Sequence, residues 1–343
     1  MVLNLRGASR RRERGAVIIW LTLFLLVLIG FGSLSVDVAK LAAARTQLQN
    51  AADAAALAGA SALDPGTAMI VQPLAITRAQ AAALSNKAFI TDPQPVVLAA
   101  ADVTFPTPLR VRVKVRREGS ESVVTTLAQV LGIKQPSVTA TATAKLDTVG
   151  TALCGVVPLG VSPNAGQNFQ IGCANLYTLK TGGGAGGGGE YGAINFSYCA
   201  NQGVCAGMNP SGGNTFRCLL TNGYCCPLTV GQVVDTESGN MAGPTKQAIN
   251  SRFAADAVTT ENICYSDYVS RGGTGQRVVL LPITTPVAGN RQVTILGFCA
   301  FFIRNRPGNG DIVGEFMYQV IAGTGGGSGT GPVVFSLRLV PNS

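Results

Sequence analysis

Residues 10–63 read RRRERGAVIIWLTLFLLVLIGFGSLSVDVAKLAAARTQLQNAADAAALAGASAL, and this stretch decides how the rest of the chain is organised. It joins a basic cluster, an apolar run and an alanine-rich tail, with no proline among them. Residues 16–36 form the run, 21 residues without a charge. A helix rising about 1.5 Å per residue would cover the roughly 30 Å hydrocarbon core of a bilayer. The pattern predicts a transmembrane helix over residues 16–36.

The helical pattern continues beyond the apolar run as an amphipathic half over residues 37–63. Apolar residues recur every seven positions, while Lys40 and Gln49 occupy other faces. Alanine favours helix and allows another helix or a sheet to approach closely. Asp64, Pro65 and Gly66 predict the end of this helix. The expected packing stripe consists of Leu34, Leu41, Leu48, Ala51, Ala55 and Ala58.

The formal net charge of +9 comes from two short clusters. Residues 1–15 contribute +4 and residues 110–117 contribute +5, whereas the 226 residues after them are almost neutral. A general nucleic-acid-binding surface is not expected from such a distribution.

The first basic cluster predicts the orientation in the membrane, because basic flanks stay on the cytoplasmic side. A cleaved signal peptide has a similar start, but its apolar centre is usually about 7 to 15 residues long. The longer run favours a retained anchor with residues 1–15 as a cytoplasmic tail and the C-terminal part outside. The orientation residues are Arg10, Arg11, Arg12 and Arg14.

Cysteine usage agrees with an oxidising exterior, because no cysteine precedes residue 154. A zinc site is the alternative, but the chain has no histidine and no CxxC motif. The odd number leaves at least one thiol free or bonded to another chain, and spacing does not give the pairing. The candidate disulfide residues are Cys154, Cys173, Cys199, Cys205, Cys218, Cys225, Cys226, Cys264 and Cys299.

A small α/β unit is expected over residues 64–149. Composition favours a helix over residues 74–88, and LRVRVKVRR at 109–117 has the period-two pattern of a strand with one buried and one basic face. The basic face is interpreted as a solvated surface, with anionic lipid headgroups or an acidic partner as the alternative. A short helix over 121–131 and a strand over 137–146 complete the unit.

From about residue 150 short apolar runs are separated by turn signals, which predicts a β-rich domain over 150–343, stapled by cysteines. Two glycine tracts, at 182–189 and 322–332, are interpreted as loops, because a phosphate-binding loop would need a following GK[ST]. The expected fold class is therefore α+β: a long N-terminal helix, a small α/β unit and a β-rich, disulfide-stapled domain.

Little in the chain indicates catalysis. The absence of histidine excludes a Ser-His-Asp triad and imidazole metal ligands. Asp235 and Glu237 are interpreted as part of a loop that caps a helix beginning near Pro244, with acid–base work or cation binding as alternatives. We expect no enzyme activity, no cofactor and no metal.

A family resemblance rests on RGA at 14–16, VDV at 36–38 and QLQNAADAAALAGA at 47–60. Together these resemble the N-terminal segment of TadE/TadG-like proteins of the tight-adherence (Flp pilus) assembly system. Segments at 127–146, 154–161 and 236–252 resemble TadG-related proteins. The resemblance implies an inner-membrane-anchored component of pilus assembly, akin to a minor pilin or an anchoring factor, with pilins or other assembly proteins as partners.

Two departures from relatives limit what the resemblance implies. Prepilin-type relatives are cut after a glycine followed five positions on by glutamate, whereas Gly15 is followed there by Trp20. Cleavage at Gly15 is therefore not expected. The Asp-x-Ser-x-Ser motif of von Willebrand-type domains does not occur, so metal-dependent adhesion is not expected either.

Several functional hypotheses stay open on the sequence. The alanine stripe fits packing against the chain's own head, or lateral self-association as in filaments. The first hypothesis is a non-enzymatic, single-span pilus-assembly protein whose partners are the lipid bilayer and other pilus components. The alternatives are a membrane-tethered adhesion or binding module not required for pili, and an envelope enzyme that uses carboxylates.

Overall fold

The computed structural model divides the chain into two compact units. The first unit comprises residues 1–63, 69–144 and 339–343, and the second comprises 64–68 and 145–338. The division falls inside strand β5, a few residues before the domain boundary predicted at residue 150. The structure describes residues 10–63, 68–89, 93–126, 136–162, 169–179, 191–196, 203–209, 211–237, 239, 241–287, 291–308, 311–321, 323–325 and 334–341.

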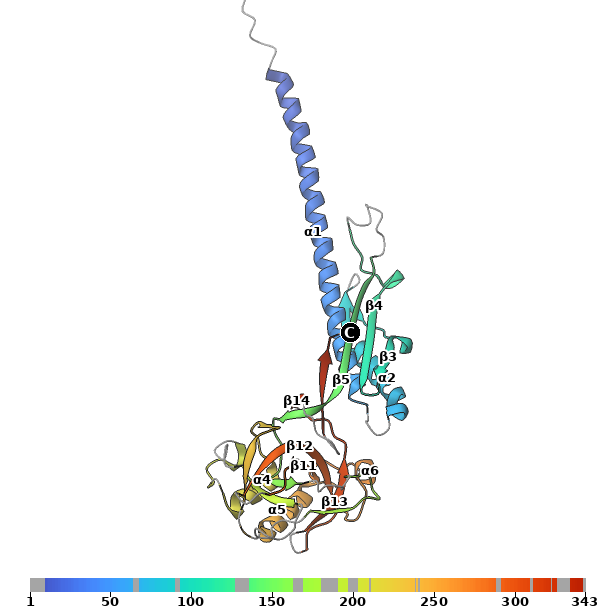
Figure 1. The fold of residues 1–343 in the computed structure, drawn as a ribbon. Helices are drawn as coiled ribbons and strands as arrows, with labels where there is room; N and C mark the ends of the chain where they lie inside the picture. The colour runs from blue at the N-terminus through green and yellow to red at the C-terminus, as the bar shows by residue number, and fades with distance from the viewer. Residues whose placement is uncertain are drawn as a thin grey trace, which may run out of the picture. The chain divides into compact units, whose positions relative to one another are not determined.

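The first unit is built around one helix that runs without a break (Figure 1). The C-terminal half of this helix lies beside a short hairpin and a sheet in the order β5-β4-β3. The elements are α1 (Arg10–Ala60), α2 (Ala68–Ser85), β1 (Lys87–Phe89), β2 (Pro93–Pro95), the 3-10 turn Ala100–Asp102, β3 (Val103–Thr107), β4 (Arg110–Arg117), the 3-10 turn Gly119–Glu121 and the first part of β5 (Val138–Ala152).

Sequence periodicity predicts these elements well, and their ends less well. The strand over 109–117 is confirmed as β4, and that over 137–146 as the start of a longer β5. The helix predicted over 74–88 begins earlier, at Ala68, and includes Pro73. It also ends earlier, because Lys87–Phe89 pair with Pro93–Pro95 as a hairpin. In the short helix predicted over 121–131, residues 122–126 are not helical and the remainder lies outside the described residues.

The second unit is rich in strands, as expected, and contains three α-helices among its described residues. The predicted α+β class is confirmed. The elements are the rest of β5, β6 (Leu159–Val161), β7 (Tyr177–Leu179), β8 (Tyr191–Asn195), the 3-10 turn Gly203–Cys205, α4 (Gly213–Asn222), β9 (Leu228–Thr229), β10 (Val233–Thr236), α5 (Ala242–Ala255), α6 (Tyr265–Ser270), β11 (Val278–Thr284), β12 (Gln292–Ile303), β13 (Ile312–Met317), β14 (Gly323–Gly325) and most of β15 (Phe335–Val340).

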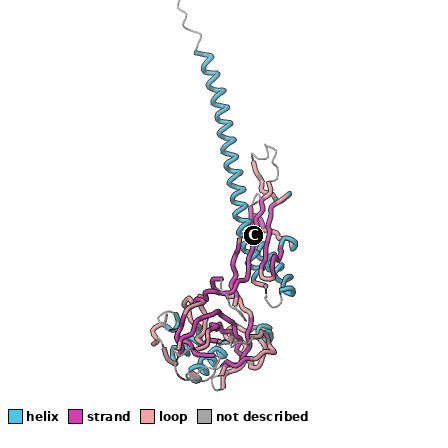
Figure 2. The backbone as a smooth tube through the Cα atoms, in the orientation of Figure 1, coloured by secondary structure: helices cyan, strands magenta, loops and turns pink. Residues whose placement is uncertain are grey.

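Five strands of the second unit close into a ring (Figure 2). β6 pairs with β8, β8 with β10, β10 with β12, β12 with β11, and β11 returns to β6. The β6–β11 pair is parallel and the other four are antiparallel. β12 is long enough to pair with β10 near its start and with β13 near its end. Closure satisfies the strand edges that an open sheet would leave exposed.

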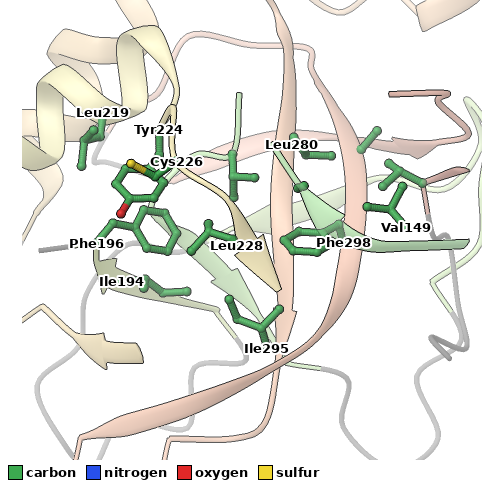
Figure 3. Close-up of a cluster of buried hydrophobic side chains, with 14 of the residues drawn as sticks. Val149, Ile194, Phe196, Leu219, Tyr224, Cys226, Leu228, Leu280, Ile295 and Phe298 are labelled. Atoms are coloured by element: carbon green, nitrogen blue, oxygen red, sulfur yellow. The ribbon is translucent and has the colours of Figure 1, made fainter. Parts of the chain in front are cut away.

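A hydrophobic cluster supports this ring. Figure 3 shows Phe298 and Ile295 of β12 beside Leu228 and Leu280, with Phe196 next to Tyr224. Each of these side chains is buried, and the Phe196 and Tyr224 ring centroids lie 4.8 Å apart. The aromatic and β-branched residues that predicted strands in this region therefore form its core.

Candidate functional site

The N-terminal half of α1 is apolar and exposed. Large side chains from Val17 to Val38 are uncovered, and Trp20 is 73% exposed. Among the described residues, the segment Val17–Ala60 contains the one helix long and apolar enough to cross a membrane, and its most apolar window has a mean hydropathy of 2.6. The prediction of a candidate membrane span is thus confirmed, and the length and composition are compatible with a single-span protein.

The predicted orientation residues lie in the first turns of α1. The helix begins at Arg10 and includes Arg11, Arg12 and Arg14, immediately before the apolar run. Their side chains lie outside the part of the chain that the structure describes, so the orientation stays a prediction that rests on their position in the sequence.

The C-terminal half of α1 buries a stripe of small residues against its own unit. Of the six predicted stripe residues, Leu48, Ala51 and Ala55 are buried, Leu41 and Ala58 are half-buried, and Leu34 is 41% exposed. Six further residues of this face are buried: Asp37, Ala44, Ala52, Ala56, Gly59 and Ala60.

The buried stripe differs from the predicted one in where it begins and in its width. It begins at Asp37, so Leu34 lies about one turn before it, in the exposed apolar run. It also includes Ala52, Ala56 and Ala60, because a helix face that packs on a sheet is wider than the narrow seam of a coiled coil.

Gly59 lies where three elements come closest. A Cβ atom at this position would lie 3.1 Å from Val111 Cγ1 of β4, 3.3 Å from the carbonyl oxygen of Ala75 and 3.4 Å from Ala79 Cβ, both of α2. Ala75, Ala79 and Ala83 of α2 are fully buried at the same interface. Small residues on both helices therefore allow α1, α2 and β4 to pack in direct contact.

Asp37 marks the point where the apolar run of α1 meets the rest of the first unit. Its side chain is 2% exposed, and its Oδ1 accepts a hydrogen bond of 2.7 Å from the backbone N–H of Thr126. Val123 is also buried in this segment. A buried carboxylate needs such partners, because leaving it unpaired is costly. The break in the apolar run was visible in the sequence, but its partner, 89 residues away, was not.

Strand β4 separates its apolar and basic faces as predicted, with one exception. Val111, Val113 and Val115 are buried, whereas Lys114 is exposed. Arg116 forms an ion pair with Asp102. The exception is Arg117, which shares the valine face and is 1% exposed.

Arg117 ties β4 to the β1–β2 hairpin. One terminal nitrogen donates to Glu121 Oε2 at 2.7 Å, and the other donates to the carbonyl oxygens of Gln94 and Pro95, each at 2.8 Å. A guanidinium with several donors suits this position, because it satisfies two backbone acceptors at once. Arg117 therefore has a structural role on the valine face, which the predicted alternation of valines and basic residues did not indicate.

The described cysteines all lie in the second unit, and three pairs are bonded: Cys154–Cys225, Cys173–Cys264 and Cys205–Cys218. Cys226 is also part of a disulfide, and Cys199 lies outside the described residues. The unpaired thiol expected from the odd count is Cys299, which is buried in β12. Burial raises the pKa of this thiol far above its usual range, so it is unreactive.

The candidate carboxylates make structural contacts. Asp235 Oδ1 accepts a hydrogen bond of 3.1 Å from Gln292 Nε2, and Glu237 Oε1 accepts one of 3.0 Å from the backbone N–H of Gly212. The helix near Pro244 is confirmed as α5, but no side chain caps its first residue, and Glu237 lies at the start of α4 instead. Asn240 lies outside the described residues. No cluster of three metal-ligating side chains occurs in the described ranges.

Tyr268 lies at the centre of a buried polar cluster in the second unit. Its hydroxyl donates to Asp256 and accepts from the N–H of Gly275, and burial together with the Asp256 bond raises the pKa of Tyr268 to about 12. Burial alone would raise the pKa of Asp256, but hydrogen bonds from Tyr268 and backbone N–H groups hold it below its usual value. The pair is fully satisfied, which favours a structural role.

Two buried arginines extend this cluster. Arg277 donates to the carbonyl oxygens of Ile303, Val258, Thr260 and Arg304, at 2.9–3.1 Å. Its Cζ also lies 4.3 Å from the ring centroid of Phe253. Arg252 donates to Leu220 O at 2.6 Å, and burial lowers its pKa to about 10. Sequence gave no signal for these roles, because neither arginine belongs to a charge pattern.

Comparison with known proteins identifies the N-terminal segment. The sequence model of the Tad TadE/G-like Flp pilus-assembly domain matches residues 15–62, which is almost all of α1 and the two residues after it. The resemblance inferred from RGA, VDV and QLQNAADAAALAGA is therefore confirmed over this segment. No curated protein and no solved structure gave a significant match. The domain supports a role in pilus assembly and, with it, interaction with other pilus components.

Proposed function

We propose that this chain is a non-enzymatic, inner-membrane-anchored component of Flp-type pilus assembly, akin to a minor pilin or a pilus-anchoring protein. One observation carries the proposal: the segment that matches the Tad domain is one continuous helix with an exposed apolar half and a buried small-residue half. The helix thus provides both a candidate membrane span and the surface on which its own folded unit packs.

The burial of the alanine stripe narrows how the protein would contact other subunits. Leu48, Ala51 and Ala55 are buried where α1 packs on its own unit, which contacts it through β4 and β1, so they do not provide a surface for equivalent helices. The exposed length from Val17 to Val38 remains for lipid and for neighbouring spans. Association through the bilayer, by close van der Waals packing of helices, is the proposed mode of contact.

The start of the basic face of β4 lies too far from the proposed span to contact headgroups. Val111 is adjacent to Gly59, which lies 23 residues beyond the apolar run. At about 1.5 Å per residue this places the start of β4 roughly 35 Å along the helix from the end of the span. Salt screens charges over about 8–10 Å, so lipid headgroups are out of reach of this part of the strand.

A non-enzymatic role is part of the proposal and is supported by the contacts of the candidate carboxylates. Asp235 and Glu237 each accept a hydrogen bond from within the protein, as a structural group would. The proposed topology places residues 1–15 in the cytoplasm and the disulfide-bonded unit outside, where thiols oxidise.

The test is piliation in a strain that lacks the gene. Complementation with the full chain should restore surface pili, whereas a chain whose residues 17–36 are replaced by polyleucine should remain anchored and fail to restore them. The matched control replaces exposed Lys246 by alanine in the second unit and should restore pili fully. Normal pili in the deletion strain, with lost attachment, would instead support the membrane-tethered adhesion module.

Protease accessibility tests the proposed membrane topology. External protease added to spheroplasts should digest the second unit and spare the N-terminal tail. A second unit protected from external protease would contradict the proposed orientation.

A further inference from the structure

We propose that the groove between α4 and α5 in the second unit binds a neutral saccharide. The groove has a volume of about 570 Å³, within the range of roughly 300–1,000 Å³ that is usual for small-molecule sites. Its walls are polar side chains from the two helices, with Met208 and Cys218 as the apolar part. This site is separate from the membrane helix that carries the proposed function.

The groove has a fixed shape. The Cys205–Cys218 disulfide holds α4 to the preceding turn, and the buried guanidinium of Arg252 on α5 donates to the carbonyl oxygen of Leu220 on α4. Arg252 also donates to Gln276 O at 2.8 Å. Because these bonds fix the spacing of the two helices, little conformational entropy would be lost when a ligand binds.

Hydrogen bonds within the walls determine what each side chain presents to a ligand. Thr221 and Ser251 donate their hydroxyls to carbonyl oxygens one turn earlier, and Asn222 Nδ2 donates to Cys218 O at 3.0 Å. These three side chains therefore retain oxygen lone pairs as acceptors. Asn250 Oδ1 is buried with no hydrogen-bond partner, so the amide group that Asn250 offers to the groove is Nδ2, a donor.

Donors come from Arg217, Gln247 and two asparagines. Arg217 Nη1 donates to Gln247 Oε1 at 2.8 Å, which leaves Gln247 Nε2 and the remaining guanidinium N–H groups as donors. Asn250 Nδ2 and the second N–H of Asn222 Nδ2 add to them. The groove thus offers three acceptors alongside these donors, and its one formal charge is positive.

These hydrogen-bond donors and acceptors indicate which class of ligand fits the groove. Phosphate, sulfate and carboxylate carry only acceptors at neutral pH, so they would pair with the donors but leave the three acceptors of the groove unpaired. An ammonium or guanidinium ligand would suit the acceptors and be repelled by Arg217. Hydroxyl groups both donate and accept, so a polyhydroxyl molecule without charge satisfies both sets. A saccharide has this chemistry at the spacing of adjacent ring carbons.

The experiment uses the full chain in lauryldimethylamine oxide micelles, because detergents with sugar headgroups would compete. Maltotetraose, cellotetraose, chitotetraose and mannotetraose are titrated separately by calorimetry and saturation-transfer NMR. At least one should bind saturably with a Kd of about 1 mM, which is suitable for an open groove. Asn222→Ala and Asn250→Ala should each weaken that binding about tenfold, the loss of one hydrogen bond.

Lys246→Ala is the matched control, because Lys246 lies on α5, is exposed and is not among the groove's lining residues. Unchanged thermal midpoints establish that the variants fold. No saturable binding of any tetrasaccharide up to about 50 mM, or equal binding by wild type and both variants, would overturn the proposal. Tighter binding of sulfate or tetragalacturonate would replace it with an anion site. Pili are counted in the same variants, and normal piliation separates this inference from the proposed function.

Discussion

The two units of this chain use opposite means of holding a core together. The first unit contains no cysteine and packs alanines of α1 and α2 against valines of β4. The second unit contains the described disulfides, a closed ring of strands, and aromatic rings with buried arginines. The core of the first unit therefore depends mainly on close packing of small side chains, and that of the second unit on disulfides and buried polar contacts. Perturbations that damage one unit should leave the other intact, and four experiments test this.

Reduction of the disulfides should have the largest effect, and only in the second unit. Loss of one native disulfide typically costs about 2–5 kcal/mol, so loss of several should exceed the stability of a single unit. Limited proteolysis with mass spectrometry, with and without a phosphine reductant, should reveal new cuts after residue 145 alone. New cuts in residues 37–63 under the same conditions would show that the units are not independent in this respect.

Replacement of Arg277 by methionine should destabilise the second unit by about 3–5 kcal/mol. The change removes four hydrogen bonds to backbone carbonyl oxygens, of which Arg304 O keeps a second donor, the backbone N–H of Asn262. Denaturant unfolding followed by tyrosine fluorescence measures the loss. Arg271→Met, at an exposed position nearby, is the matched control and should change stability by less than about 0.5 kcal/mol.

Replacement of Gly59 by valine should destabilise the first unit by about 1–3 kcal/mol through overpacking. The new side chain would collide with Val111 and with the backbone of α2. Hydrogen exchange of residues 44–60 in micelles should show the loss. Gly30→Val on the same helix is the control, since a Cβ there meets nothing within 4 Å. Equal exchange in the two variants would contradict the close packing of the stripe.

The smallest expected effect is a pH-dependent change at Tyr268. Since the folded pKa is raised to about 12 from an unfolded value near 10, its contribution is complete below pH 10 and is lost as pH rises toward 12. The stability difference between wild type and Tyr268→Phe should therefore shrink by about 1 kcal/mol between pH 8 and pH 11. Comparing the two proteins cancels titration of other groups. A constant difference would show that the hydroxyl does not titrate as described.

The same contrast explains what could be predicted from the sequence. Strand β4 and the long helix follow from periodicity, because the spacing of Val111, Val113 and Val115 fixes a face whatever covers it. The closed ring does not follow from periodicity, because it requires β11 to pair with β6, more than a hundred residues away in the sequence. No sequence pattern in β6 or β11 indicates the parallel pair that completes the ring.

The candidate site divides in the same way. The sequence indicates the features that depend on neighbouring residues: the candidate span, the cysteine-containing region and most of the packing stripe. The roles of Asp37, Arg117 and Arg277 depend on carbonyl or N–H groups far along the chain, which composition and charge cannot indicate. The exposure of Leu34 could not be predicted from periodicity, because a repeat does not indicate where along the helix the first unit begins to cover it.

The buried stripe of α1 also has a mechanical consequence. Its contacts from Asp37 to Ala60 run along the helix axis, so a pull on the span would load them all together, in shear. Contacts that are loaded together in shear resist a larger pulling force than contacts that break one after another. The bond between Asp37 and Thr126 lies at the end where that force would enter. The first unit is thus suited to bear axial tension through packing and hydrogen bonds, without a covalent tie.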